Sequence, residues 1–345
     1  MSYIDSTLDK LFEFRNLSFE EAEKAMEEIM KGEVSPVKLS AWLTALRMKV
    51  ETPEEIAGCA AGMRKHSKSI ACNDPAAVDI VGTGGDKSFS INVSTVAAFI
   101  AAGAGVTVAK HGNRSVSSKS GSADVLGALG ININMPSEIT EECLNSTGVS
   151  FLYAPLMHPA VKHAMPVRKE LGVRTVFNIL GPLANPAHVK HYVLGVYNEK
   201  LCLPIARAGL KLGFKRSLIV HGSDGLDEIT VTGSTHICEI NDGEVSEYRI
   251  TPEEFDLPLA LPEELKGGTP EENAEILKGI LSGKITGAKR NIAILNAAAA
   301  ILVSGKAGDW NSAIEKASLS IACGAASEKL QKLIDFSNRH SRFQN

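Results

Sequence analysis

Residues 82–86, which read Gly-Thr-Gly-Gly-Asp, follow directly on the apolar run 78–81. An apolar, β-branched run that stops at glycines is typical of a buried strand entering a tight loop, because glycine adopts positive φ without a steric penalty. Such a loop leaves backbone N–H groups available to an anion. Residues 90–95 then supply hydroxyl and amide groups, and a helical pattern begins at Val96. The N–H groups of that helix N-terminus face the same loop, so the composition predicts an anion-binding loop.

This loop matches neither of the two common nucleotide-binding signatures. The Walker pattern requires a glycine, four residues and then Gly-Lys-Ser/Thr, and the dinucleotide fingerprint requires Gly-x-Gly-x-x-Gly. Taken alone, residues 82–86 are equally consistent with an ordinary glycine-rich turn between a strand and a helix.

A second polar loop favours the anion site. Residues 106–109 are another short apolar run, which completes a βαβ unit with parallel strands. Residues 110–124 follow it with three cations, several serines and two glycines. Because the loops at the carboxyl ends of parallel strands meet at one edge of the sheet, both polar loops should line a single crevice. We therefore expect a phosphate or pyrophosphate site rather than a solvated loop.

Several motifs in this order resemble the anthranilate phosphoribosyltransferase family. They are residues 82–86, 92–95, 110–114, 119–124, 178–183 and 227–228, and the resemblance extends over nearly the whole chain. It implies a transferase that moves the phosphoribosyl group of 5-phosphoribosyl 1-diphosphate to the amine of anthranilate, with release of pyrophosphate, in tryptophan biosynthesis. It also implies Mg²⁺ as cofactor, with two ions per subunit, and a homodimer formed through an N-terminal helical lobe.

The resemblance assigns the contacts with phosphoribosyl diphosphate to the two polar loops. They are Gly82, Gly85, Asp86, Ser90, Asn92, Val93, Ser94, Thr95, Lys110, His111, Gly112, Asn113, Arg114, Ser115, Val116, Ser117, Ser118 and Ser122. Two positions depart from the family. Ser90 stands where threonine is common and keeps the hydroxyl, and Lys87 stands where glycine is common.

Asp227 and Glu228 suit a magnesium ion, because Mg²⁺ prefers a few carboxylates together with phosphate oxygens and water. They follow Gly225 in an expected loop, where two adjacent acidic side chains can turn the same way. From the residues alone, a solvated acidic turn is the favoured interpretation. The resemblance instead assigns both residues to the metal and adds the Ser94 hydroxyl as a ligand.

Anthranilate requires a partner for its carboxylate and space for its ring. The resemblance assigns Arg168 to the carboxylate and places Asn113 and Gly82 near the ring and the amine. Without it, Arg168 is best interpreted as a surface arginine on a helix. We assign no catalytic residue, and neither His111 nor His158 is expected to be a general base. The aromatic amine is already neutral near pH 7, so positioning and electrostatic stabilisation are sufficient.

The composition argues against several other classes of protein. The 345 residues carry a formal net charge of -4, which is unfavourable for a nucleic-acid surface. The six cysteines stand far apart in the sequence, as expected of reduced thiols in a cytoplasmic protein rather than of disulfides or a zinc site. The N-terminus has no secretory signal pattern, and the longest apolar run is too short to cross a bilayer. We expect neither a nucleic acid nor a membrane as partner.

The expected elements form a small all-helical lobe and a larger α/β lobe. Ser18, Ser35 and Thr52 are helix-start signals in an N-terminal region without strand patterns. The later alternation of strands and helices predicts a mostly parallel central sheet, similar to that of nucleoside phosphorylases and phosphoribosyltransferases. The predicted division is 1–72, with about 157–187 returning to it, for the helical lobe, and 73–156 with 188–345 for the α/β lobe.

Hydrophobic periodicity gives the approximate positions of these elements. The expected strands are 78–81, 106–109, 131–134, 150–153, 192–196 and 217–220, followed by an antiparallel pair at 235–240 and 245–250. The expected helices of the α/β region are 94–103, 122–129, 137–146, 158–171, 199–212, one capped by Thr269, 292–303 and 311–339, the last broken near Cys323.

Two other functions stay open at this stage. A pyrimidine nucleoside phosphorylase-like enzyme would share the fold and a similar Lys-x-Ser-Gly loop, but that family is longer and carries a further C-terminal domain. A nucleic-acid-binding relative without transferase activity would be basic along one face and would lack an acceptor site. The near-neutral charge and Arg168 argue against the second alternative.

Overall fold

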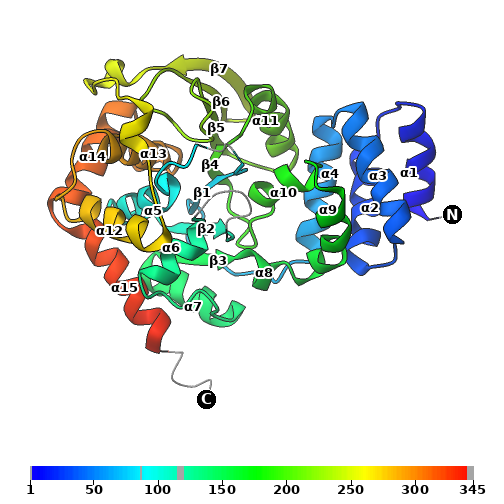
Figure 1. Ribbon diagram of the computed structural model, residues 1–345, viewed down its shortest axis with the longest axis horizontal. Helices are drawn as coiled ribbons and strands as arrows, with labels where there is room; N and C mark the ends of the chain where they lie inside the picture. Colours follow the sequence, from blue (N-terminus) through cyan, green and yellow to red (C-terminus); the bar gives the residue numbers. More distant parts are fainter. Residues whose placement is uncertain (1, 86–87, 115–119, 340–345) are drawn as a thin grey trace.

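The computed structural model describes residues 2–85, 88–114 and 120–339. Within these ranges the chain forms a helical N-terminal domain and a larger α/β domain built on a seven-stranded, mostly parallel sheet (Figure 1). The predicted site residues Asp86, Ser115, Val116, Ser117 and Ser118, and the departure at Lys87, lie outside the described residues.

The N-terminal domain begins with helices whose starts the sequence predicted. They are α1 (Tyr3–Phe12), α2 (Phe19–Lys31), α3 (Pro36–Lys49) and α4 (Pro53–Lys65). Ser18 and Thr52 each accept the backbone N–H three residues later, and the side chains of Glu21 and Glu55 accept the N–H of the cap residue in return. These reciprocal bonds satisfy donors that the helix itself leaves unpaired, so both capping boxes are confirmed.

The sheet changes its strand order at β1. Its strands are β1 (Val78–Gly82), β2 (Val108–Gly112), β3 (Val149–Tyr153), β4 (His191–Gly195), β5 (Arg216–Gly222), β6 (Thr235–Asn241) and β7 (Glu244–Ile250). Their spatial order is β3-β2-β1-β4-β5-β6-β7, with parallel pairs up to β5 and antiparallel pairs beyond it. Successive strands run outward from β1 in both directions, and the crevice at such a switch point is where α/β sheets bind ligands.

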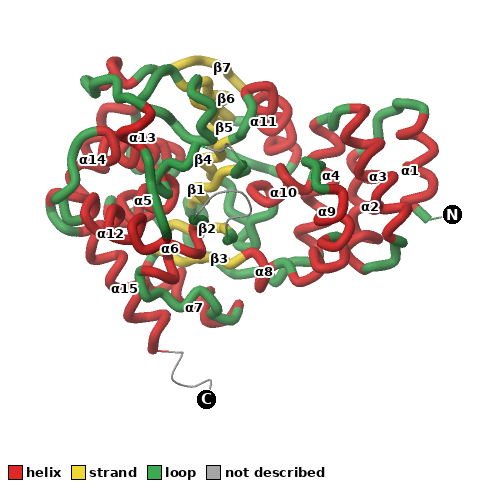
Figure 2. The backbone as a smooth tube through the Cα atoms, in the orientation of Figure 1, coloured by secondary structure: helices red, strands yellow, loops and turns green. Residues whose placement is uncertain are grey.

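Helices cover both faces of the sheet (Figure 2). One face packs on α5 (Val93–Gly103), α6 (Ser122–Ala128), α12 (Pro270–Leu281), α13 (Ala288–Val303), α14 (Trp310–Ala322) and α15 (Ala325–Arg339). The other face, with Tyr192 and Leu194, packs on α11 (Cys202–Lys211) and joins the core around Trp42 of the helical domain. The helical domain and one sheet face therefore share an apolar core.

The segment after β3 returns to the N-terminal helices. It contains α8 (Ala154–Met157), η1 (Pro159–His163), α9 (Met165–Leu171) and α10 (Phe177–Leu183). The η1 turn contacts α2, α9 contacts α3 and α10 contacts α4. The helix expected over 158–171 is interrupted at Ala164 and ends, as predicted, at Gly172 with φ +62°.

The remaining helices are α7 (Ser137–Thr147), η2 (Glu199–Leu201), η3 (Pro252–Phe255) and η4 (Pro262–Leu265).

The strand expected at 131–134 is wrong. Ile131 and Ile133 are buried, as a strand pattern requires, but the segment is a turn packed against α15. The Asn132 N–H donates to Ser337 Oγ at 3.1 Å, and the Asn134 N–H donates to the Asn132 side-chain oxygen at 3.0 Å. Side-chain acceptors thus take the bonds that a sheet ladder would use. The predicted break near Cys323 is confirmed, because α14 and α15 are separate helices there.

None of the helices in the described ranges is long and apolar enough to cross a membrane.

The α2–α4 contact provides a test of packing in the helical domain. A Cβ at Gly58 would lie 2.3 Å from the Phe19 carbonyl oxygen. We predict that Gly58→Ala lowers the free energy of unfolding by about 1–3 kcal/mol, measured by urea denaturation, because the two helices must separate. Gly127→Ala is the matched control, since no atom lies within 4 Å of its Cβ position; it should stabilise by up to about 1 kcal/mol. Equal effects of both changes would contradict the packing argument.

Candidate active site

The glycine loop and the acidic loop meet at the switch point between β1 and β4. A Cβ at Gly82 would lie 2.3 Å from Asp227 Oδ2, and a Cβ at Gly195 would lie 1.6 Å from the Asp227 carbonyl oxygen. Gly84 and Gly85 have φ values of +67° and +79°. Glycine is therefore required at Gly84 and Gly85 for positive φ, and at Gly82 and Gly195 because Asp227 lies too close for a side chain.

Both acidic side chains of the predicted metal pair turn towards the anion loops. Asp227 Oδ2 accepts the Gly84 N–H at 2.6 Å, and Glu228 Oε1 accepts the Ser94 N–H at 3.2 Å. The buried side chain of Asn296 on α13 accepts the Ile229 N–H at 3.0 Å and donates to the Ile229 carbonyl at 2.8 Å. This pair of bonds fixes the segment after Glu228. The structure thus brings Gly84, Ser94, Asp227 and Glu228 together.

Lys110 supplies a buried cation beside these acids. Its ammonium donates to the Ile80 carbonyl at 2.6 Å and to Ser94 Oγ at 3.1 Å. Burial lowers the pKa of Lys110, while Asp79, Glu228 and Asp227 oppose that shift. A buried ammonium is tolerated here because carboxylates and hydrogen-bond acceptors surround it.

Asp79 is a member of this network that sequence analysis missed. It is fully buried on β1, where Oδ1 accepts the His111 N–H at 3.0 Å and Oδ2 accepts Asn185 Nδ2 at 2.7 Å. Burial raises the pKa of Asp79 to about 7, and Lys110 opposes that rise. The available signal was an acidic residue inside the apolar run 78–81, which needs a buried partner.

The residues after the glycine loop form the next wall of the site. The Asn92 side chain donates to the Ser120 carbonyl at 3.1 Å and accepts from Asn273 Nδ2 at 3.0 Å. The Thr95 hydroxyl donates to Ser122 Oγ at 3.1 Å, and Val93 is the first residue of α5. The two predicted anion-binding segments therefore lie side by side at the start of α5.

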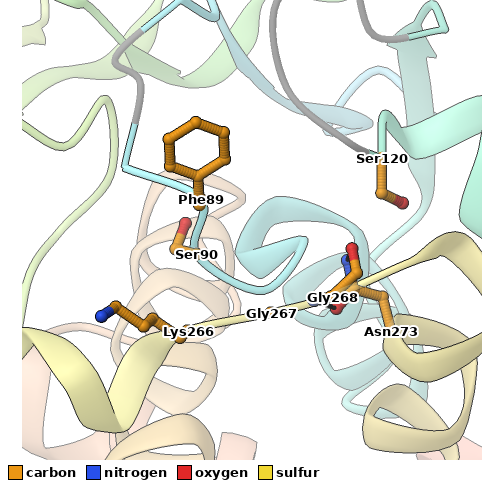
Figure 3. Close-up of a pocket in the computed structure, with 7 residues that line it drawn as sticks. All are labelled: Phe89, Ser90, Ser120, Lys266, Gly267, Gly268 and Asn273. Atoms are coloured by element: carbon orange, nitrogen blue, oxygen red, sulfur yellow. Dashed lines mark hydrogen bonds between the residues drawn. The ribbon is translucent and has the colours of Figure 1, made fainter.

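A pocket of about 420 Å³ opens beside this wall. Figure 3 shows its lining residues, which are Phe89, Ser90, Ser120, Lys266, Gly267, Gly268 and Asn273. The Ile91 N–H donates to the Leu265 carbonyl at 3.0 Å, and the Gly267 N–H donates to the Phe89 carbonyl at 2.9 Å. Sequence analysis did not assign residues 266–273, although two glycines before the capped helix at Thr269 were a visible signal.

The remaining residues of the second loop lie at its edge. A Cβ at Gly112 would lie 2.7 Å from the Phe151 ring. Asn113 accepts the Arg114 N–H with its side chain at 2.7 Å, and Arg114 pairs with Asp124 at 2.7 Å. In this structure the exposed Arg114 guanidinium is therefore held by a carboxylate on α6.

Arg168 lies on α9, in the segment that returns to the helical domain. Its guanidinium carbon lies 4.9 Å from the centre of the Phe177 ring, and burial lowers its pKa. Among the described residues, no hydrogen bond or ion pair joins Arg168 to Gly82 or Asn113. Arg174, which sequence analysis missed, instead bridges this segment to the glycine loop: it stacks on Tyr197 at 3.8 Å and donates to the Gly85 carbonyl.

Two buried histidines lie below the second loop. The ring centres of His111 and His158 are 5.0 Å apart, and His111 Nδ1 donates a hydrogen bond to the Gly181 carbonyl oxygen at 3.0 Å. Burial lowers the pKa of His111 to about 3 and that of His158 to about 4. Both rings are neutral near pH 7, with His111 hydrogen-bonded through Nδ1 and His158 packed against the His111 ring.

Comparison with known proteins places the chain in a class and then in a family. Residues 74–327 match the α/β domain of a glycosyl transferase family, and residues 5–67 match the helical bundle domain of such a family. The chain is 49% identical over 330 residues to an anthranilate phosphoribosyltransferase from Desulfosudis oleivorans, with 96% of this chain and 97% of the relative covered. It is 47% identical over 335 residues to one from Acetivibrio thermocellus, with 97% of each chain covered.

Solved structures agree with this assignment. A crystal structure of anthranilate phosphoribosyltransferase from Thermus thermophilus matches with a TM-score of 0.93 and 41% identity, covering 98% of this chain and 100% of that one. The Saccharomyces cerevisiae enzyme in complex with PRPP and Mg matches with a TM-score of 0.89 and 32% identity, covering 97% and 98%. The chain belongs to the anthranilate phosphoribosyltransferase family.

The buried histidines generate a prediction about acid stability. Burial lowers the pKa of His158 from 6.5 to about 4 in the folded chain. Between these two pH values the unfolded chain binds a proton at His158 that the folded chain does not bind. Proton binding therefore stabilises the unfolded chain in this window, and the free energy of unfolding, which is at its full value above the unfolded-state pKa, decreases as the pH falls.

We predict that, as the pH is lowered through this window, the free energy of unfolding decreases faster in the wild type than in His158→Gln. The difference in slope should be up to about 1 kcal/mol per pH unit. Chemical denaturation at several pH values measures the difference in slope. His163→Gln, which changes an exposed histidine, should retain the wild-type slope. Parallel pH profiles for wild type and His158→Gln would contradict the assignment of a neutral His158.

Proposed function

We propose that this protein transfers the phosphoribosyl group from 5-phosphoribosyl 1-diphosphate to the amine of anthranilate, giving N-(5-phosphoribosyl)anthranilate and pyrophosphate, in tryptophan biosynthesis. The observation that carries this proposal is a cluster of charged and polar groups at the switch point, which consists of Gly84, Ser94, Lys110, Asp227 and Glu228. Relatives named anthranilate phosphoribosyltransferase match nearly the full length of the chain. The test is the decrease in anthranilate fluorescence as anthranilate is consumed in the presence of phosphoribosyl diphosphate and Mg²⁺.

No observation favours either of the two alternative functions that the sequence left open. A pyrimidine nucleoside phosphorylase-like activity and a binding role for nucleic acid were the alternatives from sequence. The same fluorescence assay separates them from the proposed transfer, because neither alternative consumes anthranilate.

The chain's own residues can perform this transfer by positioning and charge. The backbone N–H groups of the glycine loop and of the first turn of α5 suit the phosphate oxygens of the donor. Lys110 adds a fixed positive charge next to these donors. Preorganised dipoles and charge of this kind stabilise a departing diphosphate without reorganisation, and no protein nucleophile is required.

The oxygen donors at the switch point fit Mg²⁺. Ser94, Asp227 and Glu228 offer one hydroxyl and two carboxylates, which are the hard ligands that Mg²⁺ takes together with phosphate oxygens and water. The contact of the Lys110 ammonium with Ser94 Oγ supports a preference for positive charge beside these acids. Bound there, Mg²⁺ would neutralise charge on the diphosphate. We propose these three residues as ligands, with two ions per subunit.

The proposed contacts with phosphoribosyl diphosphate are those predicted from sequence in residues 82–95 and 110–122. The packing of Asn92 on Ser120 and of Thr95 on Ser122 supports this proposal, because the two segments lie against each other. Part of the set lies outside the described residues and rests on the family resemblance alone.

Arg168, Asn113 and Gly82 are the proposed contacts with anthranilate. Arg168 is half-buried and lies over the Phe177 ring, and it has no carboxylate partner among the described residues. A guanidinium in this state can accept a substrate carboxylate without first breaking an ion pair. The aromatic ring beneath it also suits a flat ligand.

We further propose that the protein is a cytoplasmic homodimer joined through the helical lobe. Large apolar side chains exposed on and beside α1 and α3 support this, namely Phe12, Phe14, Val37, Met48 and Val50, each at least 62% exposed. The lobe would comprise 1–72 with about 157–187, and 73–156 with 188–345 would form the other lobe. Since the chain crosses between lobes more than once, hinge closure over substrate is expected.

The acidic pair generates a prediction about the metal. We expect the double change Asp227→Asn and Glu228→Gln to lower Mg²⁺-dependent turnover by at least about 100-fold while the fold is retained, because an amide oxygen can still accept the N–H groups of Gly84 and Ser94 but carries no charge. Initial rates across a Mg²⁺ titration, with circular dichroism, measure this.

A matched control removes two other carboxylates from the same lobe. Asp242→Asn with Glu244→Gln changes exposed residues of the β6–β7 turn, and it should leave the Mg²⁺ dependence unchanged. Full activity of the Asp227/Glu228 variant at ordinary Mg²⁺ would mean that the metal is held elsewhere.

Arg168 generates a prediction about the acceptor. Arg168→Ala should raise the KM for anthranilate about 10- to 150-fold, with little change in the KM for phosphoribosyl diphosphate, because one charge-assisted contact contributes about 1.5–3 kcal/mol. Arg168→Lys should recover only part of this, since an ammonium lacks the planar fork. Lys169→Ala, at the exposed neighbouring position, is the control.

Steady-state kinetics with each substrate varied in turn distinguish the outcomes. Equal weakening of both substrates would assign Arg168 to lobe closure rather than to carboxylate binding. Unchanged constants would make it a surface arginine without a role in binding.

A further inference from the structure

A second cluster of metal-ligating side chains lies on the antiparallel part of the sheet. His236 and Cys238 on β6 and Glu247 on β7 each direct one ligand atom to the same point, and these atoms lie within 4.8 Å of one another. His236 and Cys238 share a face of β6 because they are two residues apart. Glu247 is the register partner of Cys238 across the β6–β7 pair.

The separations between these atoms match those around a tetrahedral ion. Cys238 Sγ lies 3.8 Å from His236 Nε2 and 3.7 Å from Glu247 Oε2, and His236 Nε2 lies 3.2 Å from Glu247 Oε2. Zinc bonds of about 2.0–2.3 Å in tetrahedral geometry would separate ligand atoms by about 3.3–3.8 Å. The three groups therefore need only small movements to bind one ion.

Helix α11 packs on β5 and β6 beside this cluster (Figure 1). Its first residue, Cys202, is fully buried and lies outside the group of mutually close ligand atoms. A divalent cation held by the three side chains of the cluster would take its fourth ligand from water.

The other ring nitrogen of His236 lies near a carboxylate. While Nε2 points to Cys238 and Glu247, Nδ1 lies 3.2 Å from Glu199 Oε1, and Glu199 is held by Arg249 at 2.6 Å. A carboxylate on the second ring nitrogen is the usual outer-shell partner of a metal-bound histidine. The His236 side chain is 14% exposed and that of Glu247 is 47% exposed, so an ion can enter from solvent.

We propose that His236, Cys238 and Glu247 form a site for a zinc-type divalent cation. The ligands come from β6 and β7, so a bound ion would join the two strands of this antiparallel pair. Thiolate and imidazole ligands favour zinc and cobalt over magnesium, which prefers oxygen. The site is therefore chemically distinct from the proposed magnesium ligands and independent of the proposed transferase activity.

Cobalt titration of the chelator-treated full-length protein tests this proposal. We expect one equivalent of Co²⁺ to produce thiolate-to-cobalt charge-transfer absorption, which Zn²⁺ abolishes and excess Mg²⁺ does not. Cys238→Ala and His236→Gln should each lose stoichiometric binding, and Glu199→Gln should weaken it about 10-fold. Cys323→Ala, which removes an exposed cysteine elsewhere, should bind like the wild type.

Thermal denaturation gives an independent measurement. Zn²⁺ should raise the melting temperature of the wild type and of Cys323→Ala but not that of His236→Gln, whose partly exposed position keeps the test usable if Cys238→Ala does not fold. Absence of the charge-transfer band, an unchanged band in His236→Gln, or displacement of Co²⁺ by Mg²⁺ would each overturn the proposal. A failure of transferase activity would leave these binding results unaffected.

Discussion

The close approach of the Asp227 backbone to Gly82 and Gly195 is the constraint on which the site depends. Any side chain at either glycine would overlap Asp227, so the acidic loop could not cross the ends of β1 and β4. With glycine there, Asp227 reaches the Gly84 N–H and Glu228 reaches the Ser94 N–H. Two loops more than 130 residues apart in sequence are thereby fixed to each other through these bonds. The backbone therefore sets the geometry of the proposed anion site.

Charge balance is the second requirement of this arrangement. Lys110 is buried, and burial alone would favour its neutral form. Asp79, Asp227 and Glu228 keep an ammonium favourable, while Lys110 in turn limits the rise in the Asp79 pKa. Removing one member would leave a buried charge uncompensated, which costs more than the interaction itself contributes. The network therefore behaves as one unit, and Asp79 supports it from beneath through Asn185 and the His111 backbone.

Sequence analysis succeeded where local rules decide the structure. Capping signals at Ser18 and Thr52 and the glycine break at 323–324 depend on neighbouring residues, and all are present. The alternation at 131–134 failed because a turn under α15 buries alternate residues as a strand does. Arg174, Asn185 and Asn273 were missed because their partners are distant in sequence: Gly85, Asp79 and Asn92 lie 89, 106 and 181 residues away. No local pattern encodes such pairs.

The same limit explains why the sequence did not suggest the proposed zinc-type site. His236 and Cys238 lie two residues apart on β6, and Glu247 joins them only through the antiparallel register with β7. That register also reaches the acidic loop, since Thr235 at the start of β6 accepts the Thr230 N–H at 3.0 Å. The segment from Asp227 to β6 is thus anchored by Asn296 before β6 begins and by the α11 contact along it. The oxygen ligands proposed for Mg²⁺ precede this anchor, and the nitrogen and sulfur ligands proposed for a zinc-type ion follow it, so the two proposed sites differ in the kind of ion that their ligands favour.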